Sequence, residues 1–186
     1  AFVLHTPRVA DRRPSTWTIA HLQDLMPDNI LVSKDDVLKL TDFGSVRPFG
    51  AKNEQFTQGV ITPNYRPLEI FFGATLYGPA VDIWSCGCVF AEMFRGDVLF
   101  PGMRETEIIG NIYLIIGSPN SSRETEWPGC VDLPNYLPST KPISNQSLKK
   151  AVGCTDIAYG LLSKMLRHDP NKRITTKQAL QDRYFE

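Results

Sequence analysis

The feature that most constrains the fold is the stretch Pro79–Phe94, which is apolar on nearly every side when drawn as a helix. A helix without a polar face cannot lie on the surface, so the rest of the chain is expected to pack around it. Asp82 stands near its N-terminus, where an acid can accept backbone N–H bonds. We therefore predict one globular unit built about a buried central helix.

The flanking patterns predict further short elements. Ile30–Val32 and Val37–Leu40 are β-prone runs separated by a polar turn, which indicates a hairpin. Three more segments are typical of helices: 105–116, closed by a glycine and a proline, 155–167, and a last one that starts near residue 176. The fold class predicted from these elements is mainly α with a short β-hairpin.

Three segments lack the regular spacing of apolar residues that predicts a helix or a strand. Residues 1–20 contain prolines that break any helix and are predicted to form an irregular lead-in. Residues 42–69 form a long polar stretch, and such stretches within a compact chain are usually functional. Residues 117–150 are rich in Pro, Ser and Asn, and we expect a loop-rich insertion there.

Composition restricts the class of protein. The 186 residues suit one domain or one lobe of a larger one, and 20 basic side chains balance 20 acidic ones. This balance gives no reason to expect direct nucleic-acid or membrane binding. The four cysteines lack C-x-x-C spacing, which argues against zinc, and Cys86 and Cys88 fit reduced core thiols. Without a signal peptide, we expect an intracellular protein of the nucleus, the cytoplasm or both.

A small set of polar residues predicts chemistry. Asp24 and Asn29 lie five residues apart, and Asp42 follows beyond the predicted hairpin, next to Phe43 and Gly44. Asp24 can accept a proton from a hydroxyl nucleophile, while Asn29 and Asp42 supply hard oxygen ligands suited to Mg²⁺. The alternative is that these are solvated acids on turns.

These residues resemble motifs of the protein kinase family, which occur here in the family's order. The matching segments are the catalytic loop Asp24–Asn29, the D-F-G site Thr41–Gly44, the end of the activation segment Tyr65–Glu69, the buried helix Asp82–Gly87 and the closing Asp169–Thr175. The resemblance covers roughly residues 21–186, with 42–69 as the activation segment. It implies the C-terminal lobe of a kinase, an α+β kinase fold lacking the N-terminal lobe.

Finer motifs are similar to the cyclin-dependent branch. They are Leu99–Gly102, Gly117–Asn120, Trp127–Gly129 and Leu133–Tyr136. Phe72–Ala74 with Tyr77–Gly78 is similar to the CDK-activating kinases within that branch.

The resemblance implies a serine/threonine kinase that transfers the ATP γ-phosphate, with Ser-Pro or Thr-Pro sites as targets. Asp24 would orient and deprotonate the substrate hydroxyl, and Thr62 would bridge the catalytic loop and the substrate platform. Asn29 and Asp42 would hold Mg²⁺ on the ATP phosphates, and Leu31 would lie under adenine. The implied partners are a protein substrate and a cyclin or other regulatory subunit.

Other positions gain roles from the same resemblance. Arg66 and Val60 would shape a pocket that prefers proline after the target residue. Thr57 falls where this branch carries an activating phosphothreonine; a phosphate adds about −1.5 to −2 charge, for which Arg47 is a partner. The alternative is that Thr57 is an ordinary surface threonine.

Three further residues would be structural under the same resemblance. Glu69 and Arg173 would pair as a buried brace, and Asp82 would support the central helix.

The chain also departs from the family pattern. Gln23 occupies the arginine position of the catalytic loop, and Met26 replaces the lysine that would contact the transferred phosphate. Losing one such electrostatic group typically costs about 10²–10³ in rate. Pro67-Leu68 stands for Ala-Pro, and Asn64 stands for a tryptophan. The 186 residues contain no glycine-rich loop and no V-A-I-K lysine.

Two alternatives to an active kinase remain open at this point. The chain is either a truncated pseudokinase that acts as a binding module or an imperfect gene product. In each case the face that an N-terminal lobe would cover should expose apolar surface around Leu31 and Phe43, which predicts self-association.

Overall fold

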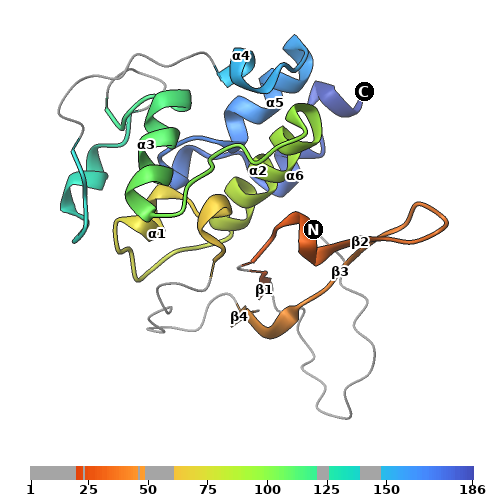
Figure 1. The fold of residues 1–186 in the computed structure, drawn as a ribbon, viewed down its shortest axis with the longest axis horizontal. Coiled ribbons are helices and arrows are strands. Elements are labelled where there is room, and N and C mark those ends of the chain that lie inside the picture. The colour runs from red at the N-terminus through yellow and green to blue at the C-terminus, as the bar shows by residue number, and fades with distance from the viewer. Residues whose placement is uncertain (1–19, 23, 46, 49–60, 121–125, 139–147) are drawn as a thin grey trace.

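The computed structural model describes residues 20–22, 24–45, 47–48, 61–120, 126–138 and 148–186, which form a helical body with a projecting hairpin (Figure 1). The helices are α1 Leu68–Phe71, α2 Ala80–Arg95, α3 Glu105–Ile116, α4 Leu148–Val152, α5 Asp156–Met165 and α6 Thr176–Ala179. The strands are β1 Ala20–His21, β2 Ile30–Val32, β3 Leu38–Leu40 and β4 Arg47–Pro48. Short 3₁₀ turns are η1 Pro27–Asn29, η2 Phe43–Ser45, η3 Pro63–Tyr65, η4 Pro128–Asp132, η5 Pro170–Lys172 and η6 Arg183–Phe185.

Helix α2 lies at the centre of the body, as its composition predicts. Helices α4 and α5 and the turns η3 and η5 pack against it, and Trp84 and Ala91 have no exposed surface. The helix ends at Gly96, whose φ of 75° is left-handed and whose N–H donates to the Glu92 carbonyl. The exposed residues of this helix lie in its last turn, where Met93 is 77% exposed.

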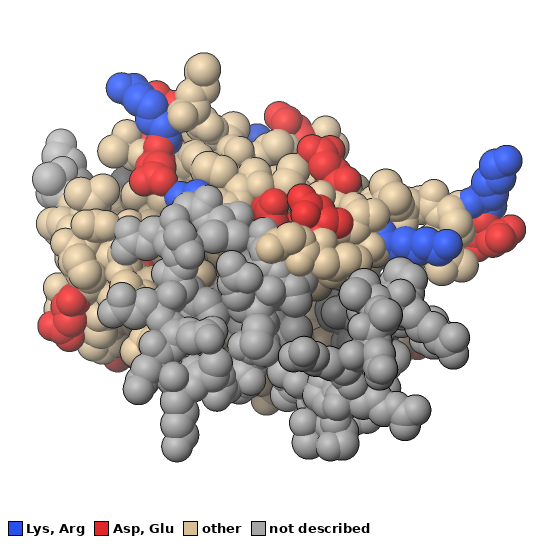
Figure 2. All heavy atoms as spheres, turned by 90° about the horizontal axis from the view of Figure 1, so that it is seen from below, with Lys and Arg blue, Asp and Glu red and all other residues tan. Residues whose placement is uncertain are grey.

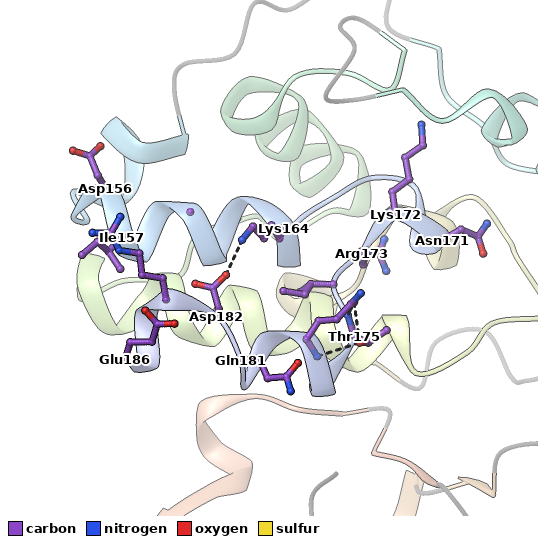
Figure 3. A pocket seen from close by; sticks show the side chains of 14 residues that line it. Asp156, Ile157, Lys164, Asn171, Lys172, Arg173, Thr175, Gln181, Asp182 and Glu186 are labelled. Carbon is purple, nitrogen blue, oxygen red and sulfur yellow. Dashed lines mark hydrogen bonds and ion pairs between the residues drawn. The ribbon is translucent and has the colours of Figure 1, made fainter.

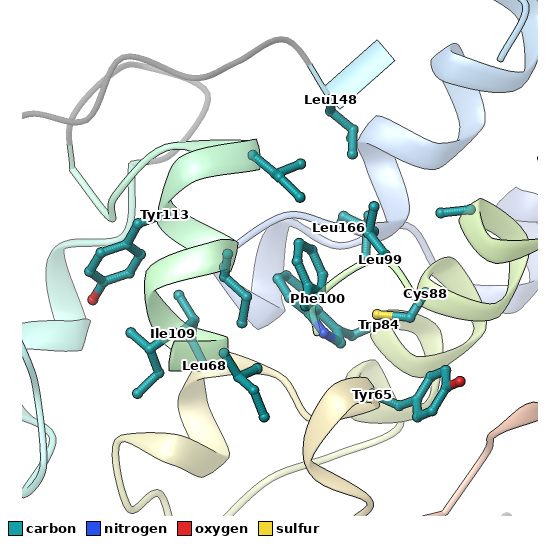
Figure 4. Packing of buried hydrophobic residues seen from close by; sticks show 14 of the residues in the cluster. Tyr65, Leu68, Trp84, Cys88, Leu99, Phe100, Ile109, Tyr113, Leu148 and Leu166 are labelled. Carbon is teal, nitrogen blue, oxygen red and sulfur yellow. The ribbon is translucent and has the colours of Figure 1, made fainter. Parts of the chain in front are cut away.

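Aromatic side chains fill the space between α2 and the segments that follow it (Figure 4). Trp84 stacks on Phe100 at 5.8 Å between ring centroids and lies 6.3 Å from His168. Helix α3 adds Ile108 and Ile112, both fully buried. Full burial of each such side chain stabilises the fold by about 1.5–3 kcal/mol.

The predicted helices agree with the observed ones most closely where end signals are present. Helix α3 has the predicted bounds, and the Glu107 carboxylate accepts the backbone N–H groups of Met103 and Arg104 ahead of it. Helix α5 begins after Thr155, whose hydroxyl accepts the Ala158 N–H, and ends two residues before the predicted Arg167. Helix α6 is one turn long.

The predicted hairpin is present as β2 and β3, which pair antiparallel with Leu31 opposite Lys39. Its turn needs a left-handed residue, and Asp36 takes that place with φ 57°. The hairpin projects from the helical body (Figure 1).

A second pairing was not predicted. Strand β1 pairs antiparallel with β4, which places Ala20 opposite Pro48. Ala20, assigned to the irregular lead-in, is therefore in a strand, and residues 42–69 contain β4, η2, η3 and the start of α1. Residues 1–19 lie outside the described part of the chain.

In the described residues, no helix has both the length and the apolar character that a membrane crossing would require.

Candidate active site

The Asp24 carboxylate is held by Thr62, which lies within the long stretch 42–69. Its Oδ1 accepts the Thr62 hydroxyl at 2.7 Å and the Thr62 backbone N–H at 3.0 Å. The two residues are 38 positions apart in sequence, and both are partly buried. Two donors on one carboxylate oxygen fix the direction of the acid and leave Oδ2 less engaged.

Asn29 is tied to the same loop through its amide nitrogen. Its Nδ2 donates to the Asp24 backbone carbonyl at 2.9 Å and lies 3.5 Å from the Asp24 Oδ2. Because the nitrogen faces Asp24, the amide oxygen is turned away from it and remains available as a hard ligand. The turn η1 supplies the geometry, with Pro27 at its first position.

Asp42 is brought to the same end of the hairpin by the strand pairing. The Thr41 N–H donates to the Asn29 carbonyl at 2.9 Å, so Asp42 follows directly on a residue bonded to Asn29. Asp42 is exposed, with a left-handed φ of 55°, and its Oδ1 accepts the Gly44 N–H at 3.2 Å. The Asp42 Oδ2 accepts no hydrogen bond from the described residues and can therefore bind a ligand.

Met26 contributes sulfur where the family pattern has a lysine. Its Sδ lies 3.1 Å from the Thr62 hydroxyl oxygen, and its side chain packs partly against the main core. The position therefore supplies no positive charge beside Asp24. A thioether is only a weak hydrogen-bond acceptor, so Asp24 remains the principal acceptor for Thr62.

Thr62 is positioned by anchors that the sequence analysis did not identify. The Ser85 hydroxyl donates to the Tyr65 carbonyl at 2.9 Å, which fastens η3 to α2. The Asn64 amide donates to the Phe100 carbonyl at 2.9 Å, so the residue in the tryptophan position still ties this segment to the core. No local pattern signals these contacts, because their partners lie 20 and 36 residues away.

Asp82, near the start of α2, binds the segment that precedes Asp24. Its Oδ2 accepts the backbone N–H of Leu22 at 2.9 Å across 60 positions. An acid near this helix start was expected to accept N–H groups, and the observed donor belongs to the loop. The central helix thus holds the segment that leads into Asp24.

Arg66 is buried, with a side chain 7% exposed. Its Nε and Nη2 both donate to the Ile61 carbonyl, at 3.0 and 2.7 Å, and Nη1 pairs with Glu105 at 2.6 Å. The guanidinium carbon also lies 5.1 Å from the centre of the Phe71 ring. Arg66 therefore braces the backbone next to Thr62. Glu105 is a functional neighbour that the sequence analysis missed.

The expected pair between Glu69 and Arg173 is present and almost free of solvent, with side chains 3% and 0% exposed. The two bonds are parallel, at 2.5 and 2.6 Å, and Arg173 also donates to the carbonyls of Ala80, Arg167 and His168. Removing one partner of such a pair typically costs about 3–5 kcal/mol, because the other charge is left buried.

Tyr65 adds a polar contact near the loop. Its hydroxyl donates to Glu92 at 2.7 Å, and burial together with the Glu92 carboxylate raises the pKa of Tyr65 above its ordinary value. The phenol therefore stays protonated and keeps its bond to Glu92 at neutral pH.

The face predicted to lie against a nucleotide is open and apolar. Leu31 is 52% exposed and Phe43 is 44% exposed, and Val32 and Leu38 of the same hairpin are exposed further. The expectation of exposed apolar surface around Leu31 and Phe43 is thus confirmed. Seen from the side of β1 and β4, acidic side chains gather between the body and the hairpin (Figure 2).

Several predicted positions cannot be placed. Gln23, Thr57 and Val60 lie outside the described residues, and so does the side chain of Arg47, whose backbone is in β4. The predicted phosphothreonine and its arginine partner therefore remain predictions.

The donors present fit the metal that the resemblance implies. The Asn29 amide oxygen and the Asp42 carboxylate are hard oxygen ligands, and Mg²⁺ is commonly held by one or two such groups together with substrate phosphates. No cluster of three or more His, Cys, Asp or Glu side chains suited to a metal occurs in the described ranges. A Mg²⁺ ion bound by these two residues would take its remaining ligands from water and from substrate phosphates.

A separate pocket of about 1060 Å³ lies on the C-terminal side, between α5, η5, α6 and η6 (Figure 3). Its walls carry mixed charges, including the Lys164–Asp182 ion pair at 2.7 Å. Arg173 lines the pocket, but its guanidinium is already paired with the Glu69 carboxylate. We place the candidate site at Asp24 instead, because there a carboxylate oriented by Thr62 adjoins Asn29, whose carbonyl is bonded to the residue before Asp42.

Two comparisons with known proteins identify the family of this chain. The family model for the protein kinase domain matches residues 17–185. Among solved structures, a chain in the CAK complex from Chaetomium thermophilum bound to ATP-γ-S is 39% identical, with a TM-score of 0.79. The match covers 89% of this chain and 52% of that one, so this chain spans about half the length of its relative. The chain belongs to the protein kinase family, and within it is cyclin-dependent-kinase-like, with a fold that resembles the kinase C-terminal lobe.

Proposed function

We propose that this chain provides the catalytic base and the metal-binding residues of a serine/threonine kinase that transfers the ATP γ-phosphate to Ser-Pro or Thr-Pro sites. The observation that carries the proposal is the Asp24 carboxylate, oriented by both donors of Thr62 and adjoining the Asn29 amide. A base in a kinase must be held at a fixed angle to the attacking hydroxyl, because catalysis here relies on positioning and charge.

The residues have separate roles in this proposal. Asp24 orients the substrate hydroxyl and accepts its proton, while Thr62 keeps the carboxylate aligned. Asn29 and Asp42 hold Mg²⁺, which neutralises charge on the ATP phosphates when bound. Leu31 offers an exposed apolar side chain to the adenine ring. The acidic surroundings favour nucleotide that arrives with its cation over free nucleotide.

The partners follow from the same proposal. The similar chain comes from an assembly called the CAK complex, so we propose a regulatory subunit, such as a cyclin, together with a protein substrate. Arg66 supports the substrate platform through the Ile61 carbonyl.

A second function is favoured by Met26. Without a cation beside Thr62, a developing negative charge on the transferred phosphate lacks one stabilising group. The alternative is a non-catalytic binding module that keeps the fold and docks partners.

The experiment compares the wild type with Met26→Lys and Asp24→Asn. Each protein is supplied with the N-terminal lobe of a cyclin-dependent kinase in trans, and transfer of labelled phosphate from Mg-ATP to a Ser-Pro peptide is measured. The active-kinase proposal expects Met26→Lys to raise the rate by about 10²–10³ and Asp24→Asn to abolish transfer.

Equal background rates in all three proteins would exclude the kinase and favour the binding module. The binding module further expects partner binding to be unchanged by Asp24→Asn. The melting temperature of each variant is the control for folding.

A further inference from the structure

The methionine in the catalytic loop lies against the hydroxyl that orients Asp24. Its sulfur is 3.1 Å from the Thr62 Oγ1, whose single proton goes to Asp24 Oδ1 at 2.7 Å. The thioether competes poorly for that proton because it is a weak acceptor. The three side chains are all partly buried and none is sealed from water.

Oxidation of Met26 to a sulfoxide would change the competition between Asp24 and Met26 for the Thr62 proton. Its oxygen is a strong acceptor, and a polar group without a partner is costly in a partly buried site. At a separation of 3.1 Å there is no room for an extra oxygen between the sulfur and the Thr62 hydroxyl. A sulfoxide oxygen on this side of the sulfur would force the hydroxyl to turn towards it or to move away, and either change would weaken the bond to Asp24.

We propose that Met26 is a reversible oxidation site that controls the Thr62–Asp24 contact. The oxidant is a peroxide: its terminal oxygen is transferred to the sulfur lone pair, the O–O bond breaks, and water or an alcohol leaves. The sulfur loses two electrons and the peroxide gains them. A thiol-dependent methionine sulfoxide reductase reverses the step.

The consequence for phosphate transfer rests on the function proposed above, whereas the contact itself can be measured without turnover. The chain has four methionines, so the other three serve as references for the oxidation rate of Met26. Met103 is 99% exposed and Met93 is 77% exposed, while Met165 is buried at 5%. Among the described residues, none of these three methionines makes a hydrogen bond to Asp24, Asn29, Asp42 or Thr62.

The test treats the whole chain with dilute hydrogen peroxide and follows each methionine by peptide mass spectrometry. Oxidation of Met26 is expected to be slower than that of Met103 and at least about tenfold faster than that of Met165. Hydrogen exchange at the Thr62 amide, which donates to Asp24, is expected to accelerate roughly five- to tenfold in the oxidised chain. The reductase should restore the original exchange rate.

The matched control is Met26→Leu, which keeps a similar volume and cannot form a sulfoxide. Peroxide should leave Thr62 exchange unchanged in this variant, although Met93, Met103 and the cysteines are still present. The double variant Met93→Leu/Met103→Leu should still show the acceleration. The proposal is overturned if Met26 is as resistant as Met165, or if its oxidation leaves exchange at Thr62 unaltered.

Discussion

His168 is a titratable side chain that the fold surrounds completely. Its Nε2 lies 2.8 Å from the Gly117 carbonyl, and because a carbonyl only accepts, this nitrogen carries the proton. The other ring nitrogen, Nδ1, is buried without a partner among the described residues. Burial lowers the pKa of His168 to about 4, the Gly117 bond opposes the shift, and the charge of Arg173 adds to it.

This pKa predicts a loss of stability in mild acid. The unfolded chain binds the proton near pH 6.5 and the folded chain only near pH 4, so stability falls as the pH drops through this window. The full loss is about 3 kcal/mol, reached below pH 4. Urea unfolding at pH 7 and pH 5 should show a smaller decrease for His168→Phe than for the wild type. Parallel pH curves for the two proteins would contradict the assignment.

Helix α2 packs against the C-terminal end of α5 at a glycine. A Cβ added to Gly87 would lie 2.9 Å from Leu166 Cδ2 and 3.1 Å from Met165 Cβ. Gly87→Ala is therefore expected to destabilise the chain by about 1–3 kcal/mol through overpacking. The Gly110 position in α3 has no atom within 4 Å of such a Cβ, so Gly110→Ala should stabilise by about 0.5–1 kcal/mol.

The two alanine variants form a matched pair, because each replaces a glycine within a helix. Thermal unfolding monitored by circular dichroism checks both. A higher melting temperature in both variants would show that helix propensity, rather than the α2–α5 contact, decides the outcome at Gly87.

At the scale of the molecule, the projecting hairpin makes the isolated chain prone to associate. Leu38 is 68% exposed and Val32 is 63% exposed on neighbouring strands, and the outer edges of both strands pair with no other strand of the described residues. Light scattering of increasing concentrations should show species larger than the monomer. Val32→Lys/Leu38→Lys should reduce them, whereas Leu76→Lys, at a position 71% exposed on the α1–α2 connection, should not. A wild type that stays monodisperse would contradict the prediction.

The elements predicted best from sequence were those with local signals. Helix α3 has an acid in its first turn and a glycine after its end, and the hairpin has a polar turn between β-prone runs. The β1–β4 pair and the Asn64 anchor were not predictable, because each depends on a partner far along the chain. The pairing of Glu69 with Arg173 was predicted from family order, and its burial was then observed.

The separation between those two charges also bears on how the protein is made. Glu69 and Arg173 are 104 positions apart, so on a ribosome the acid emerges long before its partner is synthesised. At about 5–20 residues per second the delay is roughly 5–20 s, during which burying the acid would leave it uncompensated. The segment around Glu69 can therefore reach its buried, paired state only once Arg173 has left the ribosomal exit tunnel, which makes this contact one of the late steps in folding.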